Sequence, residues 1–211
     1  MITRRLVFTV IAQAIAFPVA AAPASIAVTT RPVITMLGDS ITAGLGIPAR
    51  DALPARLQAA LQASGRPTVV RGAGVSGDTT SGGLARLDFS VQSDTTLCIV
   101  ELGGNDYLQS VDPRLVQSNL TQIVTQLHKR GIKVILLGGH APAGGSGAYG
   151  RAFNAAFAAA GKAPGVVAVP DFLDTVLGHP GLLQPDGVHP NAAGVGVLVD
   201  RLAPVVKRAL R

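Results

Sequence analysis

The chain has 211 residues, of which 48% are hydrophobic and 4% are aromatic, and tryptophan is absent. This length suits one domain with a sizeable core, and a core of small aliphatic side chains suits helices packed closely on a parallel sheet. The formal charge is +6, but the arginines are scattered and form no cluster with aromatic residues, which argues against a nucleic-acid-binding surface.

The first 24 residues have the features of a signal peptide. Two arginines form a short basic head, an apolar run covers residues 6–19, and small residues around Ala22 and Ala24 offer a cleavage site. The run is shorter than the ~20 residues that a membrane span needs. We therefore expect residues 1–24 to be removed on export to the periplasm or the medium, which leaves residues 25–211 as one domain without stable membrane insertion. An uncleaved anchor is the alternative, and the export route stays open.

Short β-like runs alternate with amphipathic stretches along the rest of the chain. Such alternation is typical of βαβ units and a parallel sheet. We therefore predict an α/β fold, a three-layer α/β/α sandwich around a five-stranded parallel sheet. The expected strands are residues 33–37, 68–71, 96–101, 133–137 and 166–169.

Helices are expected between these strands, each with start or stop signals. Asp51 is the predicted N-cap of the first helix, Pro113 opens the third, and Pro204 is expected to disturb the last. The predicted helical ranges are 52–64, 79–89, 113–130, 150–160 and 191–210.

Polar clusters follow the predicted strands. In open α/β sheets, ligands bind outside the carboxyl ends of the strands, at the point where the strand order reverses. If the order is the flavodoxin-like 2-1-3-4-5, the loops that carry Ser40, Gly77 and Asn105 become neighbours. The clusters are residues 38–40, 74–79 and 103–106, after the first three strands, and residues 186–189, after the fifth.

These clusters contain the parts of a serine nucleophile site. A serine hydroxyl is unreactive at neutral pH unless a neighbouring base takes its proton, and that base needs an orienting carboxylate. Ser40 is the candidate nucleophile, His189 the base and Asp186 the carboxylate. The backbone N–H groups of Ser40 and Gly77 and the side-chain amide of Asn105 are the candidate oxyanion donors.

Each motif also has a structural interpretation when it is taken alone. Gly-Asp-Ser can be a turn and helix cap, Gly77 can simply occupy a backbone position with a positive φ, and Asn105 can cap a helix. The coincidence of all of them at one predicted sheet edge favours a catalytic site. The spacing of His, Cys and Glu suggests no metal site, and no nucleotide-binding glycine loop follows the first strand, so we expect no metal or cofactor.

Two residues of the third strand receive structural interpretations. Cys98 is the single cysteine and lies in an apolar run, so we expect a small buried hydrophobe and no internal disulfide. Glu101 ends the same strand; it is a candidate for supporting the site, and a hydrogen-bonded strand end is the interpretation we prefer.

At the polar clusters the chain resembles the GDSL or SGNH hydrolases, specifically the bacterial arylesterase, acyl-CoA thioesterase I and lysophospholipase L1 group. The order and spacing of the motifs match those of this group across residues 25–211. The resemblance implies the flavodoxin-like SGNH hydrolase fold, a triad of Ser40, Asp186 and His189, an oxyanion hole completed by Gly77 and Asn105, and no metal or cofactor. The matching motifs are Gly38-Asp39-Ser40, Gly74-Val75-Ser76-Gly77-Asp78-Thr79, Gly103-Gly104-Asn105-Asp106 and Asp186-Gly187-Val188-His189-Pro190.

The chain departs from this group at two places. Gly72 stands where the group usually carries Asn, which removes a supporting hydrogen bond near Ser40. The loop that begins at His140 is glycine-rich, where an arginine- and asparagine-containing version is expected. Because this loop helps shape the acyl pocket in relatives, we consider His140 a candidate substrate contact, together with Tyr107. A partly buried structural role is the alternative for His140.

We therefore expect an exported serine esterase or thioesterase that hydrolyses small- to medium-chain acyl esters of arylesterase, acyl-thioester or lysophospholipid type through an acyl-enzyme. The expected partner is a small-molecule acyl ester or thioester, and the expected state is a monomer. The alternatives are a polysaccharide O-acetylesterase with the same triad and a non-catalytic ligand-binding protein on this fold. Acyl chain length and ester against thioester preference stay open.

Overall fold

The computed structural model describes residues 31–138 and 147–211. The predicted signal peptide and His140 lie outside the described residues, so both remain predictions. Five strands form one sheet in the order β2-β1-β3-β4-β5, and all neighbouring strands are parallel. This is the flavodoxin-like order on which the expected grouping of the Ser40, Gly77 and Asn105 loops depends. The strands are β1 (Val33–Gly38), β2 (Val69–Gly74), β3 (Leu97–Glu101), β4 (Lys133–Leu137) and β5 (Val166–Val169).

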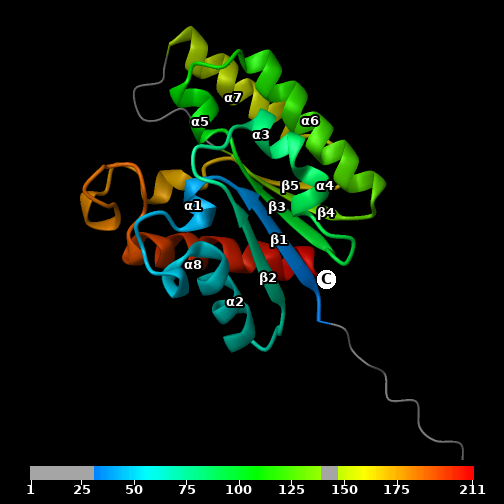
Figure 1. Cartoon of the computed structure of the whole chain (residues 1–211), viewed down its shortest axis with the longest axis vertical. Helices are drawn as coiled ribbons and strands as arrows, with labels where there is room; N and C mark the ends of the chain where they lie inside the picture. Colours follow the sequence, from blue (N-terminus) through cyan, green and yellow to red (C-terminus); the bar gives the residue numbers. More distant parts are fainter. Residues whose placement is uncertain (1–30, 139–146) are drawn as a thin grey trace, which may run out of the picture. The chain divides into compact units, whose positions relative to one another are not determined.

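Helices cover both faces of the sheet, which confirms the α/β/α sandwich. In Figure 1, α2 and α8 lie on one side of the strands, and α6 and α7 lie on the other. In the described parts of the chain, no helix has the length and apolar character to cross a membrane. The α-helices are α1 (Ser40–Ala43), α2 (Leu53–Ala63), α3 (Thr80–Ala85), α4 (Leu87–Ser90), α5 (Gly104–Leu108), α6 (Pro113–Lys129), α7 (Ala148–Gly161) and α8 (Ala192–Ala209), and the 3-10 helices are η1 (Ala49–Asp51), η2 (Leu173–Thr175) and η3 (Pro180–Leu182).

The strands divide the core into two hydrophobic clusters because successive side chains point to opposite faces of a sheet. Ile34 and Met36 of β1 pack with the cluster of α2 and α8, whereas Leu37 packs with that of α6 and α7. All five residues of β3 are buried, as expected for a strand with helices on both faces. Cys98 is therefore an internal hydrophobe, and burial raises the pKa of its thiol to about 12.

Three details of the helices differ from the prediction. Asp51 does not cap α2, because it closes the short helix η1 and its carboxylate accepts a hydrogen bond from Arg56 instead; Ala52 is the N-cap. The predicted helix 79–89 is two helices that meet at Arg86. Helix α8 continues through Pro204, which is exposed, so water can solvate the carbonyl that lacks its N–H partner.

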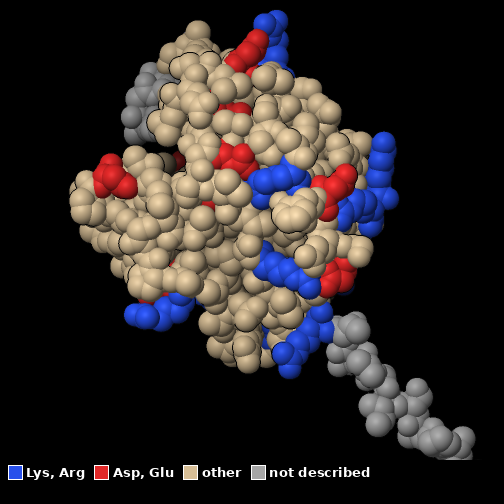
Figure 2. Space-filling model, viewed as in Figure 1, with Lys and Arg blue, Asp and Glu red and all other residues tan. Residues whose placement is uncertain are grey.

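Charged side chains are dispersed over the face shown in Figure 2, and several arginines on the molecule pair with carboxylates. Arg71 donates to both carboxylate oxygens of Asp94, and Arg86 donates to Asp78 at 2.7 Å. Because a nucleic-acid footprint needs concentrated, unpaired cations, this face offers no such surface.

The carboxyl ends of β1 and β2 lie in close contact with α1. A Cβ atom added at Gly74 would lie 2.3 Å from the backbone N of Ala43 and 2.7 Å from the carbonyl oxygen of Asp39. Both neighbours are backbone atoms, which cannot move aside as a flexible side chain does. The small size of Gly74 therefore lets the segment that carries Ser40 rest directly on the end of β2.

We expect Gly74→Ala to lower the free energy of unfolding by about 1–3 kcal/mol, the usual cost of overpacking a tight site. Urea unfolding followed by circular dichroism measures this change. Gly181→Ala is the matched control, because a Cβ atom at Gly181 meets nothing within 4 Å. Equal stability of the two variants would contradict the close packing of α1 on β2.

Candidate active site

The loops after β1, β2 and β3 meet at one edge of the sheet. Ser40 is the first residue of α1, immediately after β1. The amide of Asn105, in the first turn of α5, donates to Asp39 in the loop after β1 and to the carbonyl of Asp78 in the loop after β2. One side chain thus joins all three loops.

Ser40, His189 and Asp186 form a continuous chain of hydrogen bonds. Ser40 Oγ lies 2.9 Å from His189 Nε2, and His189 Nδ1 lies 2.7 Å from Asp186 Oδ2. Because a carboxylate can only accept, Nδ1 carries the proton and Nε2 is left to accept from the Ser40 hydroxyl. The tautomer assigned from these contacts is the one that a general base requires.

A compact turn orients the Asp186 carboxylate towards the histidine. Asp186 Oδ1 accepts from the backbone N–H groups of Val188 at 2.9 Å and His189 at 3.0 Å. Gly187, which lies between Asp186 and Val188, has a φ of 71°. The N–H of His189, then that of Val188 and the bond to the imidazole, lower the pKa of Asp186 to about 2. Asp186 therefore stays ionised at neutral pH, and its stabilisation of the fold is lost as the pH falls from about 3.8 towards 2.

Side chains next to this turn tie it to α8 and to the segment that carries Ser40. Asn191 caps α8 through the N–H groups of Ala193 and Gly194. Gln184 Nε2 donates to the carbonyl of Leu45, just beyond α1, at 2.7 Å and to that of Pro190 at 3.0 Å. Gln184 was not singled out in the sequence, because nothing in its local pattern indicates a contact with a residue so distant along the chain.

The three predicted oxyanion donors occupy different local structures. The N–H of Ser40 belongs to the first turn of α1, where helical N–H groups have no partner within the helix. Gly77 lies in a turn with a φ of 83°, which favours glycine. Asn105 Nδ2 donates to Asp39 Oδ2 at 3.2 Å and to the carbonyl of Asp78 at 2.9 Å. A substrate oxyanion must therefore share the Asn105 amide with these protein acceptors.

Arg86 holds the Gly77 turn in place, a role that the sequence pattern did not reveal. Its guanidinium donates to the Asp78 carboxylate at 2.7 Å and to the carbonyls of Ala73 and Gly38 at 2.9 Å each. The arginine thus joins the ends of β1 and β2 to the turn between β2 and α3.

Asp106, beside Asn105, fixes α5 against α3. Its carboxylate is fully buried and accepts from the backbone N–H of Thr80 at 2.8 Å and from the Thr80 hydroxyl at 2.6 Å. Asn119 of α6 donates to the same hydroxyl at 3.1 Å. This buried network limits the positions that the Asn105 amide can take.

A cavity of about 280 Å³ opens beside Ser40 and His189. Tyr107 forms part of its wall and packs on Phe153 and Tyr149, with ring centroids 5.2 and 5.5 Å apart. Among the predicted site residues that the structure describes, Asp186 and Gly77 are not part of the lining. The other apolar side chains of the wall include Phe153, Phe172, Leu173, Leu177 and Leu137.

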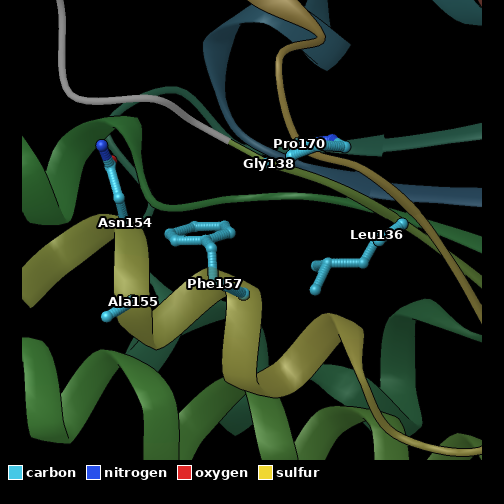
Figure 3. A pocket seen from close by; sticks show the side chains of 8 residues that line it. Leu136, Gly138, Asn154, Ala155, Phe157 and Pro170 are labelled. Carbon is cyan, nitrogen blue, oxygen red and sulfur yellow. The ribbon is translucent and has the colours of Figure 1, made fainter. Parts of the chain in front are cut away.

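A second cavity, of about 310 Å³, lies between α7 and the β4–β5 side of the sheet. Figure 3 shows Phe157 of α7 and Leu136 of β4 among its lining side chains. None of its lining residues is ionisable. Residues 31–138 and 147–211 also contain no group of three or more His, Cys, Asp or Glu side chains arranged to hold a metal ion. Of these two cavities, the one beside Ser40 is therefore the one lined by ionisable side chains.

Comparison with known proteins identifies relatives of this chain. The model of the GDSL-like lipase/acylhydrolase family matches residues 36–197. The chain is similar to esterase TesA of Pseudomonas aeruginosa, at 36% identity over 84% of this chain and 89% of that protein. It is 34% identical to thioesterase 1/protease 1/lysophospholipase L1 of Escherichia coli over 81% of each chain. The crystal structure of TesA matches with a TM-score of 0.79 and 35% identity, covering 84% of this chain and 99% of that one.

We expect Asp186→Asn to slow the reaction of Ser40 with a fluorophosphonate by about 10²–10⁴-fold. The amide still accepts the two backbone N–H groups, but its own N–H₂ faces Nδ1 and favours the tautomer that cannot accept from Ser40. The measurement is the rate of covalent labelling at neutral pH. Asp88→Asn, on an exposed carboxylate of α4, is the control and should label at the unmodified rate. Equal rates for both variants would exclude the proposed role of Asp186.

Proposed function

The chain belongs to the GDSL-like lipase/acylhydrolase family and is a serine esterase, and we propose that it hydrolyses small- to medium-chain acyl esters through an acyl-enzyme on Ser40. One observation carries this proposal: the hydrogen-bonded chain of Ser40, His189 and Asp186 opens directly into an apolar cavity. The nucleophile and the space for an acyl chain are thus adjacent.

The first half of the reaction forms the acyl-enzyme. Ser40 Oγ attacks the carbonyl carbon of the ester while His189 Nε2 accepts the hydroxyl proton, and the ionised Asp186 stabilises the resulting imidazolium. Collapse of the tetrahedral intermediate breaks the bond to the leaving group, to which His189 returns the proton. The fixed 2.9 and 2.7 Å contacts support this assignment, because the proton path exists before substrate arrives.

The second half repeats these steps with water. His189 takes a proton from the water as it attacks the acyl carbon, and the Ser40 oxygen leaves with that proton as the carboxylic acid is released. In both halves, the N–H groups of Ser40 and Gly77 and the amide of Asn105 face the oxyanion. Each such donor is worth about 10²–10³ in rate.

The wall of the cavity favours an acyl chain over a sugar. Side chains such as Phe153, Phe172 and Leu173 offer apolar surface, and each methylene group buried there contributes about 0.8 kcal/mol. A sugar would need several polar partners instead. These observations support aryl esters, acyl thioesters and lysophospholipids as substrates ahead of acetylated polysaccharide. The hydrogen bonds from Ser40 through His189 to Asp186 favour an enzyme over a non-catalytic binding protein.

We expect kcat/KM to rise with acyl length from acetyl until the cavity is filled and then to fall. A panel of aryl esters, acyl thioesters, lysophospholipid and acetyl-xylan measures this dependence. Leu177→Trp, which fills part of the cavity, should move the optimum to shorter chains. Leu115→Trp is the control, because Leu115 lies on the exposed side of α6, away from the cavity. Fastest turnover of acetyl-xylan would contradict the acyl-ester proposal.

A further inference from the structure

Two carboxyl groups are buried side by side directly behind Ser40. Asp39 is 3% exposed and Glu101 is 5% exposed. Asp39 follows the last residue of β1, and Glu101 is the last residue of β3, paired in register with Gly38. Neighbouring strand ends therefore bring both carboxyl groups into one space, in the wall of the cavity beside Ser40. The reaction described above uses neither group.

Their contacts connect this space to the groups that react. Asp39 Oδ1 accepts from the backbone N–H of Ile41 at 3.0 Å, which caps the helix that begins at Ser40. Asp39 Oδ2 accepts from Asn105 Nδ2 at 3.2 Å. Glu101 Oε2 accepts from the Thr42 hydroxyl at 2.8 Å. Asp39 thus touches both the nucleophile's helix and the oxyanion amide, and Glu101 lies behind it.

The electrostatics of this space favour a proton on one of the two carboxyl groups. Burial, followed by the charge of Asp39, raises the pKa of Glu101 well above its usual range. Burial also raises the pKa of Asp39 above its usual value. The N–H of Ile41, the charge of His189 and a hydrogen bond to Glu101 offset part of this rise. Adjacent buried carboxylates cannot both ionise without a compensating cation.

The surrounding charges do not remove this requirement. His189 faces Asp39 from the turn before α8, and Asp78 faces it from the loop after β2. The nearby guanidinium of Arg86 is bound to Asp78 and to backbone carbonyls. Within residues 31–138 and 147–211, no Lys, Arg or His side chain forms an ion pair with Asp39 or Glu101.

We propose that Asp39 and Glu101 share one proton and act as a positioning pair for the Ser40 site. Glu101 is the acid and donates to Asp39, and the Asp39 carboxylate orients the Asn105 amide and the N-terminus of α1. The inference rests on the proposed function for its kinetic part only. Loss of the shared proton at alkaline pH places a second negative charge beside the oxyanion and lowers the rate.

The test compares two substitutions of Glu101 over a range of neutral to alkaline pH. Glu101→Ala removes the donor, and we expect kcat to fall about 10²-fold, the scale of a small misplacement of catalytic groups, with little change in KM. Glu101→Gln retains a donor towards Asp39 and an acceptor for Thr42, so it should recover most of this loss. It should also lack the alkaline decline of the unmodified enzyme, because the glutamine cannot ionise.

Two further measurements keep the proposal testable if Glu101→Ala does not fold. Thr42→Val removes a hydroxyl that stabilises ionised Glu101, so the alkaline decline should move to higher pH. Infrared spectroscopy at neutral pH should detect the carbonyl stretch of a protonated carboxyl group, and Glu101→Gln should abolish it.

The outcomes separate this inference from the proposed function. An alkaline decline that is unchanged in Glu101→Gln, or absence of the protonated carboxyl band, would overturn the shared proton. A folded but inactive Glu101→Gln variant would overturn it as well, because an ionised Glu101 would then be needed. Absence of esterase activity in the unmodified protein would overturn the proposed function and leave the infrared result to decide the protonation of the pair.

Discussion

The position of β1 between β2 and β3 brings three strand ends to one place, and the residues of the site depend on this arrangement. Ser40, Gly77 and Asn105 each follow one of these ends. The close approach of α1 to Gly74 brings backbone groups at this edge together, and buried polar groups are almost always hydrogen-bonded. The hydrogen bonds of Arg86 and Asn105 satisfy several of these groups.

The hydrogen bond between Ser40 and His189 joins residues 149 positions apart, and its geometry is set by elements on both sides. Ser40 is held by the end of β1 and the cap of α1, and His189 by the turn that Asp186 and Asn191 fix before α8. Gln184 connects the two sides through the carbonyl of Leu45. Because these supports are formed without substrate, the groups need little reorganisation during reaction, which is the main source of catalytic power in such sites.

The strands could be predicted, because apolar runs and the polar clusters after them are local in sequence. Their order is not local; it was assumed from the flavodoxin-like fold, and the predicted grouping of Ser40, His189, Asp186 and Asn105 at one sheet edge depended on it. Helices α1 and α5 were not predicted, since four or five residues are too few to show a helical period. Asp51 has the residue type of an N-cap, but the 3-10 turn η1 ends at it. The contacts of Arg86 and Gln184, and the proximity of Glu101 to Asp39, run across strands and loops, so only the register and packing reveal them.

Formation of a covalent acyl-enzyme on Ser40 is the central claim, and direct detection of that intermediate tests it. The enzyme is mixed rapidly with an aryl acetate, quenched in acid and digested, and its peptides are analysed by mass spectrometry. We expect one acetyl group per chain, located on Ser40, and none after Ser40→Ala, which should also lose turnover while keeping its fold. Acetylation at another residue, or continued turnover by Ser40→Ala, would contradict the assignment of the nucleophile.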